Sequence, residues 1–299
     1  MKNIRNFVPE IMTLLISKKM ILSMMLAVTP LIINAEGEDR YRIETVDGTV
    51  FIGILLEEDD EKIVIRSERF GELTIEKTDI IKMTKIDPRR IKDGVYWFEN
   101  PQPTRYLFGT NAIGLKKGQG YYQNAWIFFN NVNVGITDNI SIGGGIIPLF
   151  LLGVSDTPVW VFPKFSIPIE KGNIHVAAGA MIGGIVGRES AGLGLVYVVS
   201  TIGTSDDNLS FGIAYGYGDG SWSKSPVMNI SGMIRLGRTL YLISENWFFP
   251  GEEFAGIISA GIRWAPEKFA VDFALIRPLD TDGGFIGVPW LGVTIPFGR

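Results

Sequence analysis

The chain has 299 residues, a formal net charge of −4, a sequence pI of about 5.3 and no cysteine. The lack of cysteine excludes disulfides, thiolate metal ligands and a cysteine nucleophile. The acidic balance argues against a nucleic-acid partner, because phosphate binding needs a basic face. Glycine is abundant, at 36 residues, and the mean hydropathy of +0.21 is high. Past residue 35, no apolar run reaches the roughly 20 residues of a membrane-spanning helix. This combination indicates either a very apolar soluble β protein or strands whose alternate residues face lipid.

Residues 1–35 have the pattern of a secretory signal peptide. Lys18 and Lys19 precede an apolar stretch, Met20–Ile33, which ends at Ala35 before the acidic Glu36. A positive segment, a short apolar segment and a small residue at the cleavage point are typical of such signals. An uncleaved N-terminal anchor is the alternative interpretation. The signal predicts export of the mature chain.

Residues 36–88 are rich in charged side chains and carry apolar residues at every second position. These positions are Val50, Ile52, Ile54 and Leu56, then Ile63 and Ile65, then Leu73 and Ile75. Turn signals separate the runs, which predicts four or five short antiparallel strands. The segment Asp47–Gly53, followed by a charged turn and Ile63–Arg66, resembles the small barrels of Sm-like and SH3-like proteins. We expect this domain to lie in the periplasm and to be available to a periplasmic partner.

Residues 89–104 are expected to form a linker, which contains Pro101 and Pro103. From residue 105 to residue 299 the charge density falls and most of the glycines occur. Broad apolar side chains alternate with small or polar ones, as where Phe211 and Ile213 flank Gly212. Strands of about 9–11 residues with this alternation are typical of outer-membrane barrels.

The connections between the predicted strands sort by length. Strands are expected near 105–114, 121–136, 139–150, 158–169, 174–187, 191–203, 208–218, 226–237, 239–247, 254–264, 268–277 and 285–297. Tight links such as Thr137-Asp138 alternate with longer ones such as Leu151–Thr157, except around Gly187–Ala191. Short periplasmic turns alternating with longer outer loops are a habit of outer-membrane barrels. The predicted fold is therefore an all-β, up-and-down antiparallel barrel of twelve strands, with ten as the alternative.

The end of the chain, Gly292–Phe297, resembles the C-terminal insertion signal of outer-membrane barrels, although Trp290 and the trailing Gly298-Arg299 depart from it. The whole chain resembles uncharacterised exported barrel proteins of Gram-negative bacteria that pair a small N-terminal β domain with a glycine-rich barrel. The resemblance implies an outer-membrane location and no particular activity. Aromatic residues near strand ends are expected to form girdles at the lipid headgroups. They are Tyr121, Tyr122, Trp126, Trp160, Tyr215, Tyr217, Trp222, Tyr241, Trp247, Trp264 and Trp290.

If the broad apolar face meets lipid, a sparse polar set lines the interior. The predicted lumen network consists of Lys164, His175, Arg235, Glu245, Arg263 and Asp272, with Asn229 and Ser231 beside it. Opposite charges in a narrow lumen would pair, because an unpaired buried charge is costly. The interpretation favoured for this set is a stabilising ion-pair plug, and a selectivity lining is the alternative.

No catalytic, metal or cofactor site is expected. Ser221–Lys224 matches a hydrolase motif only by letter, and Asp280–Gly283 is a short carboxylate loop rather than a calcium site. The leading hypothesis is a non-enzymatic outer-membrane barrel, with a structural role or a role as a small-solute pore or binder, whose main partner is outer-membrane lipid. The alternatives are a periplasmic soluble barrel that binds an apolar ligand and a barrel-wall lipid hydrolase that uses His175, the only histidine. Nothing in the sequence predicts an oligomeric state.

Overall fold

The computed structural model describes residues 39–154, 156–170, 173–186, 192–218, 220–251, 255–279 and 285–298. The predicted signal peptide, the link at Gly187–Ala191 and the carboxylate loop Asp280–Gly283 lie outside these residues. The chain divides into two compact units, with the boundary between Tyr96 and Trp97. Within the described ranges, no helix is long and apolar enough to cross a membrane.

The first unit contains one antiparallel sheet in the order β4-β3-β2-β1-β5. Its strands are β1 (Arg40–Thr45), β2 (Val50–Glu58), β3 (Lys62–Ser67), β4 (Gly71–Glu76) and β5 (Ile80–Lys85), with 3-10 turns η1 (Lys77–Asp79) and η2 (Pro88–Arg90) and a small hairpin of β6 (Ile91–Lys92) and β7 (Val95–Tyr96). The turn from β1 to β2 is tied by Asp47, which accepts hydrogen bonds from the Thr45 hydroxyl at 2.6 Å and from the backbone N–H of Thr49 at 3.0 Å. These bonds lower the pKa of the Asp47 carboxyl below its usual value.

The core of this sheet is built from isoleucines on alternate positions. Ile43, Ile63, Ile65 and Ile75 are buried against one another. On β2 the residues that pack on them are Phe51 and Leu55, whereas Val50 and Leu56 are exposed. Both faces of β2 are apolar, so the alternation alone does not say which face turns inward. The register decides it, because Ile43 of β1 pairs with Phe51.

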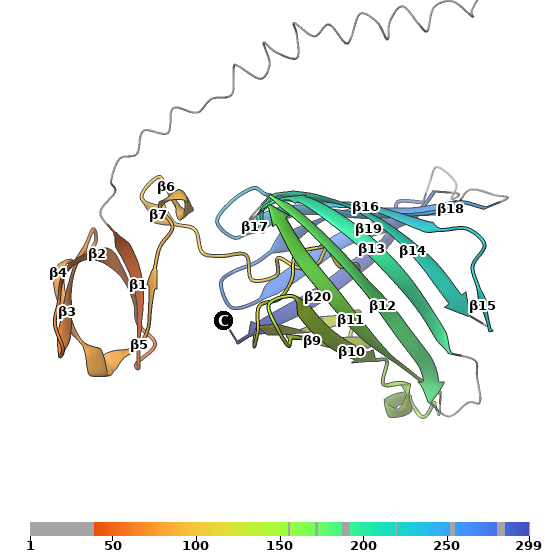
Figure 1. Cartoon of the computed structure of the whole chain (residues 1–299), viewed down its shortest axis with the longest axis horizontal. Helices are drawn as coiled ribbons and strands as arrows, with labels where there is room; N and C mark the ends of the chain where they lie inside the picture. The colour runs from red at the N-terminus through yellow and green to blue at the C-terminus, as the bar shows by residue number, and fades with distance from the viewer. Residues whose placement is uncertain are drawn as a thin grey trace, which may run out of the picture. The chain divides into compact units, whose positions relative to one another are not determined.

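The second unit is a closed antiparallel barrel of twelve strands (Figure 1). In the described ranges they are β8 (Gly120–Ala125), β9 (Phe129–Gly135), β10 (Ile140–Ile146), β11 (Thr157–Glu170), β12 (Ile174–Val186), β13 (Leu193–Gly203), β14 (Asn208–Gly218), β16 (Val227–Arg235), β17 (Leu240–Phe249), β18 (Ala255–Trp264), β19 (Ala270–Pro278) and β20 (Val288–Phe297). A two-residue strand, β15 (Ser221–Trp222), pairs antiparallel with the end of β14. Pairing of β20 with β8, from Gly292 opposite Ala125 to Phe297 opposite Gly120, closes the sheet. The predicted all-β barrel with twelve strands is confirmed.

Two of the predicted strands are wrong, and the errors cancel in the count. Residues 105–114 form no strand. The expected single strand at 121–136 is instead the hairpin of β8 and β9. Its turn is made by Trp126 and Ile127, whose φ values of 48° and 68° are unusual for such residues. An apolar turn of this kind carries none of the glycine or proline signals that mark a strand end.

The connections fall into two sets at the two ends of the barrel. One end, here named the short-turn end, carries the tight links β9–β10, β11–β12, β13–β14, β16–β17 and β18–β19, and the C-terminus (Figure 1). The opposite end, named the long-loop end, carries the longer link from β10 to β11, which includes the 3-10 turn η3 (Leu149–Leu152). The β8–β9 turn also lies at the long-loop end and is its short exception. The predicted sorting of loops therefore applies to the links from β14 to β16 and from β19 to β20, but not to the first hairpin.

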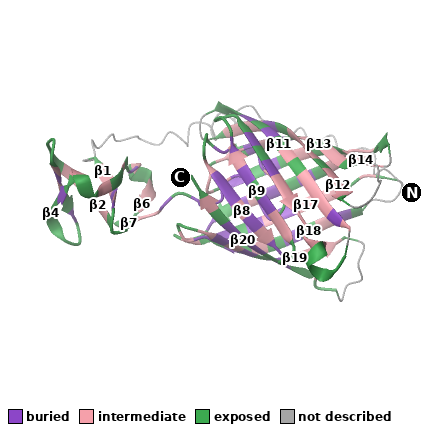
Figure 2. Ribbon diagram, turned by 90° about the horizontal axis from the view of Figure 1, so that it is seen from below, coloured by how far each residue is buried: buried purple, intermediate pink, exposed green. Residues whose placement is uncertain are grey.

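Burial alternates along each barrel strand, as the checkered colouring in Figure 2 shows. Outward positions hold large apolar side chains that are exposed, among them Phe165, Ile182, Val198, Phe211, Ile213, Ile234, Phe273 and Ile295. Inward positions hold small and polar residues, among them Asn131, Ser141, Thr201, Ser210, Ser231 and Thr294. The apolar faces are thus on the outside of the barrel and are not sealed against a second sheet. Several residues expected in aromatic girdles point inward instead: Tyr121, Tyr241 and Trp290 are buried.

Candidate functional site: a lumen closed by an internal hairpin

The lumen contains a segment of the chain that precedes the first barrel strand. This segment, named the plug, comprises residues 98–115. Its buried members are Phe98, Asn100, Pro101, Gln102, Thr104, Arg105, Tyr106, Leu107, Asn111, Ala112 and Leu115. The plug folds back on itself as an irregular hairpin: Arg105 and Thr110 form an antiparallel bridge, and the backbone N–H of Tyr106 donates to the Gly109 carbonyl at 3.0 Å.

Both arms of the plug begin at the short-turn end. The Asn100 amide donates to the carbonyl of Ser205, in the β13–β14 turn, at 2.8 Å. After the second arm, the backbone N–H of Lys117 donates to the Asp138 carboxylate, in the β9–β10 turn, at 3.0 Å. The tip of the plug therefore points from the short-turn end into the middle of the barrel.

The tip is bound by the carboxylate of Glu245 on β17. Its oxygens accept hydrogen bonds of 2.9 Å from the backbone N–H groups of Leu107, Phe108 and Gly109, and of 2.8 Å from the Trp247 indole. Several converging N–H dipoles make a favourable cradle for a buried anion. A Cβ at Gly109 would lie 3.0 Å from Trp247 and 3.1 Å from Glu245, so glycine allows this close approach.

Arg263 on β18 holds the first arm of the plug. Its side chain is 0% exposed and forms a two-bond ion pair with Asp272 on β19, at 2.6 and 2.9 Å. The remaining N–H groups donate to the backbone carbonyls of Gln102 at 2.8 Å, Arg105 at 3.2 Å and Tyr106 at 2.7 Å. The planar guanidinium thus satisfies one carboxylate and three plug carbonyls at once.

Lys164 on β11 holds the returning arm. Its ammonium donates to the Thr110 hydroxyl at 3.0 Å and to the carbonyls of Asn111 at 3.1 Å and Ile113 at 2.8 Å. These three bonds use all three ammonium donors. No carboxylate of the described residues is among its partners.

Arg235 on β16 binds the start of the plug at the short-turn end. It donates to the Phe98 carbonyl and to the Asp206 carboxylate, both at 3.0 Å. Its guanidinium also lies over the rings of Trp97, at 5.0 Å, and Tyr241, at 5.2 Å. The entry of the plug is therefore fixed by both charge and ring contacts.

Of the six predicted lumen residues, five contact the plug or the ion pair that holds it. Of the six, only Arg263 and Asp272 pair directly with each other. The side chains of Lys164, Arg235 and Glu245 form hydrogen bonds with backbone groups of the plug and not with one another. His175, on an inward position of β12, is half-buried and has no hydrogen-bond or ion-pair partner among the described residues. Within the described ranges, no group of three or more His, Asp or Glu side chains could hold a metal ion.

Sequence reasoning missed the plug itself, and with it Arg105, Tyr106 and Gly109. One signal was present. Pro101 and Pro103 interrupt the segment, and proline is poorly tolerated inside a sheet because it lacks the N–H that the ladder needs. Several polar residues, such as Asn100 and Gln102, stand where an ordinary linker would be solvated, yet both side chains are buried.

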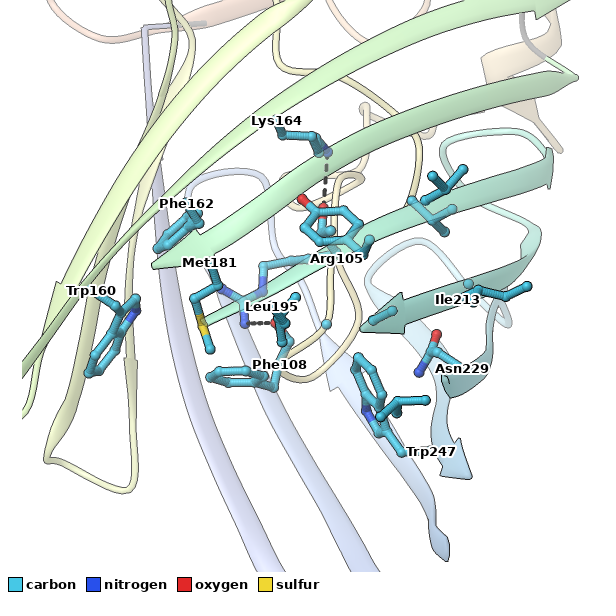
Figure 3. A pocket seen from close by; sticks show the side chains of 18 of the residues that line it. Arg105, Phe108, Trp160, Phe162, Lys164, Met181, Leu195, Ile213, Asn229 and Trp247 are labelled. Atoms are coloured by element: carbon cyan, nitrogen blue, oxygen red, sulfur yellow. Dashed lines mark hydrogen bonds between the residues drawn. The ribbon is translucent and has the colours of Figure 1, made fainter. Parts of the chain in front are cut away.

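Above the plug tip, the lumen keeps a cavity of about 110 Å³ (Figure 3). It lies towards the long-loop end, since Val227, the first residue of β16, lines it. Its floor is made by the plug residues Arg105, Phe108, Gly109 and Thr110. Its walls are mainly apolar and aromatic, from Trp160, Phe162, Met181, Leu195, Tyr197, Val199 and Trp247, with Asn131, Asn133 and Asn229 between them. The arrangement is a pocket, closed below by the plug, that can enclose a small molecule.

Comparison with known proteins identifies no family: no family model and no curated protein sequence matches the chain. Fourteen chains of solved structures match it. A structure of the KdgM porin is 7% identical over 60% of this chain and 99% of its own, with a TM-score of 0.41. The NanC porin is 11% identical over 60% and 96%, with a TM-score of 0.38, and the CymD monoaromatic hydrocarbon channel is 9% identical over 86% and 85%, with a TM-score of 0.31. At these values the matches carry no argument about function, and the description of the barrel rests on its own strand pairing.

Proposed function

We propose that the chain is a non-enzymatic outer-membrane barrel that forms a small-solute pathway closed by its own plug. The observation that carries the proposal is the combination of a closed barrel with an apolar outer face and a polar lumen filled from one end by residues 98–115. In this proposal, residues 1–35 direct export, and the short-turn end faces the periplasm together with residues 36–88.

The outer surface supports a lipid environment. Exposed large apolar residues occur on outward positions of strand after strand, and an apolar surface of that extent is unusual on a protein dissolved in water. Closure of the sheet leaves no unpaired edge, which is the condition for β-structure in hydrocarbon. The same outer face argues against the alternative of a soluble periplasmic barrel that binds an apolar ligand.

The chemistry of the plug supports a closure that can be released. The wall holds the plug largely through charged side chains that bond to its backbone: Lys164, Arg235, Glu245 and Arg263. Such hydrogen bonds can be exchanged for hydrogen bonds to water, whereas the contacts of an apolar core cannot be replaced by water in this way. Side chains alone can fill the lumen of an eight-stranded barrel. Twelve strands enclose a wider lumen, which leaves room for the plug.

Two further parts of the proposal concern the first unit and His175. The order β4-β3-β2-β1-β5 places the fifth strand beside the first, which is compatible with a small Sm-like or SH3-like barrel, and we propose that this unit binds a periplasmic partner. A hydrolase based on His175 receives no support, because that side chain has no acidic or hydroxyl partner among the described residues. A His175→Ala variant that keeps any ester hydrolysis present in the wild type would remove that alternative.

The test combines fractionation with conductance. We expect the mature chain to sediment with outer membranes, to resist carbonate extraction and to migrate faster on SDS gels before boiling than after it. In planar bilayers we expect the wild type to be mostly closed, and a variant in which residues 99–113 are replaced by a short Gly-Ser linker to conduct steadily. A freely dissolved product would contradict the location. A linker variant that stays heat-modifiable but does not conduct would contradict the pathway.

A further inference from the structure

We propose that the cavity above the plug is a binding site for a small apolar monocarboxylate, such as an aromatic acid of one ring, and that the guanidinium of Arg105 anchors the carboxylate. The biological role of this site rests on the proposed function: the ligand would be the class of solute that enters the pathway from the long-loop end. Binding itself can be measured independently of conductance.

The lining of the cavity carries positive charge. Arg105 and Lys164 are the only charged residues among those that line the cavity in the described part of the chain. Arg105 is 4% exposed and forms no ion pair with a described carboxylate. A buried guanidinium without a counter-charge is costly, and an anionic ligand would remove that cost.

Arg105 uses only part of its hydrogen-bond donors within the described structure. Its Nη2 donates to the carbonyls of Leu107 at 2.8 Å and Phe108 at 2.9 Å. Its Nε is buried without a partner, and its Nη1 makes none of the described hydrogen bonds. Arginine presents its N–H groups in a fixed fork that suits a carboxylate. Figure 3 shows the Arg105 side chain inside the cavity, near Phe108, Met181 and Leu195.

The guanidinium is also held in place before any ligand arrives. It lies over the ring of Tyr121 on β8, at 5.6 Å, and its two backbone bonds fix it to the plug tip. No ion pair between Glu245 and Arg105 is among those described: the Glu245 carboxylate oxygens accept bonds from the plug tip and from Trp247. A preorganised anchor binds more tightly, because less side-chain freedom is lost on binding.

The remaining walls of the cavity indicate the chemistry of the rest of the ligand. Beyond Arg105 the walls are the rings of Trp160, Phe162 and Trp247 with Met181 and Leu195. Such walls favour an apolar or aromatic body and give little to a strongly hydrated one. The cavity of about 110 Å³ suits one ring rather than a chain of sugars. Asn133 adds a buried Oδ1 without a partner, where a ring hydroxyl would find an acceptor.

The test uses the full-length protein in detergent, with benzoate as the probe and two isosteres as controls, neutral benzyl alcohol and cationic benzylamine. Calorimetry and the fluorescence of Trp160 and Trp247 report binding. We expect benzoate to bind at least about tenfold more tightly than benzyl alcohol, which is the scale of one charge-assisted bond, and benzylamine not to bind. Equal binding of benzoate and benzyl alcohol by a heat-modifiable barrel would overturn the inference, and so would no binding of either.

Variants separate the anchor from the walls. Arg105→Gln should lower benzoate affinity to that of benzyl alcohol, Arg105→Lys should restore part of it, and Trp160→Leu should weaken both ligands equally. Lys224→Gln, which removes an exposed cation outside the lining residues, is the matched control and should change nothing. An Arg105→Gln barrel that stays heat-modifiable and keeps its preference for benzoate would contradict the role of Arg105.

The two proposals fail separately. If benzoate binds in the wild type as expected while the linker variant does not conduct, the pathway is wrong and the site stands. If the linker variant conducts while benzoate shows no preference over benzyl alcohol, the pathway stands and the solute class is wrong.

Discussion

In the first unit, the buried apolar side chains of β1, β3 and β4 are isoleucines, and charged residues such as Arg66 and Glu72 face solvent. In the barrel the direction is reversed: Arg263 and Asp272 are inside, while isoleucines such as Ile213 and Ile182 are outside. Both units use the same two-residue alternation. Alternation therefore defines two faces of a strand, and the surroundings of the sheet decide which face is the interior.

The largest effect is expected from removing a charge from the barrel interior. We expect Arg263→Ala to cost about 3–5 kcal/mol in free energy of unfolding, because Asp272 and three plug carbonyls would be left buried without their donor. Urea unfolding of the barrel, followed by its gel mobility without boiling, measures the loss. A double variant, Arg263→Met with Asp272→Leu, should recover part of it, and an Arg263→Ala barrel as stable as the wild type would contradict the role of this pair.

The matched change in the first unit removes an inward isoleucine. Ile65→Ala should destabilise that sheet by about 2–4 kcal/mol, because the side chain is fully buried and its loss leaves a cavity. Hydrogen exchange of residues 40–85 in the full-length chain reports it. Protection that stays unchanged there would mean that this sheet does not depend on its isoleucine core.

The outer face of the barrel should respond to charge rather than to size. Ile213 is 54% exposed, so Ile213→Ala should change stability by less than about 1 kcal/mol, whereas Ile213→Arg should cost up to about 2–4 kcal/mol in a bilayer. The measurement is refolding into lipid vesicles. If Arg is tolerated there as well as Ala, this face does not meet acyl chains.

The smallest expected effect on stability, and the most informative for closure, is at the plug tip. Gly109→Ala should cost about 1 kcal/mol, because its Cβ would crowd Trp247 and Glu245, and a looser tip should raise the frequency of channel opening. Single-channel recording measures this. Gly184→Ala, on β12, is the control: that glycine has no positive φ and no atom within 4 Å of an added Cβ, so the same substitution is made without plug contact.

The barrel could be predicted from the alternation of broad and small residues, as at Phe211–Ile213, and from the sorting of the connections. The plug could not. Its backbone groups bond to wall side chains that are far away in sequence, such as Glu245 and Arg263, and no local pattern encodes those contacts. The hairpin of β8 and β9 was not predicted for a related reason: its turn, at Trp126 and Ile127, is built from residue types that usually occur within a strand.

The sequence alone was enough to predict that the barrel is all-β and which side chains share a face of a strand, because a strand's alternation is a local, covalent property of the chain. Only the folded structure shows where residues 98–115 lie and which groups the charged wall residues bind. Each of these wall residues meets its partners only once the sheet has closed: Lys164, Arg235, Glu245 and Arg263. The tertiary structure also decided that Arg105 is left with unused donors beside an apolar cavity. Closure of the sheet brings these groups together, and no spacing along the chain encodes their contacts.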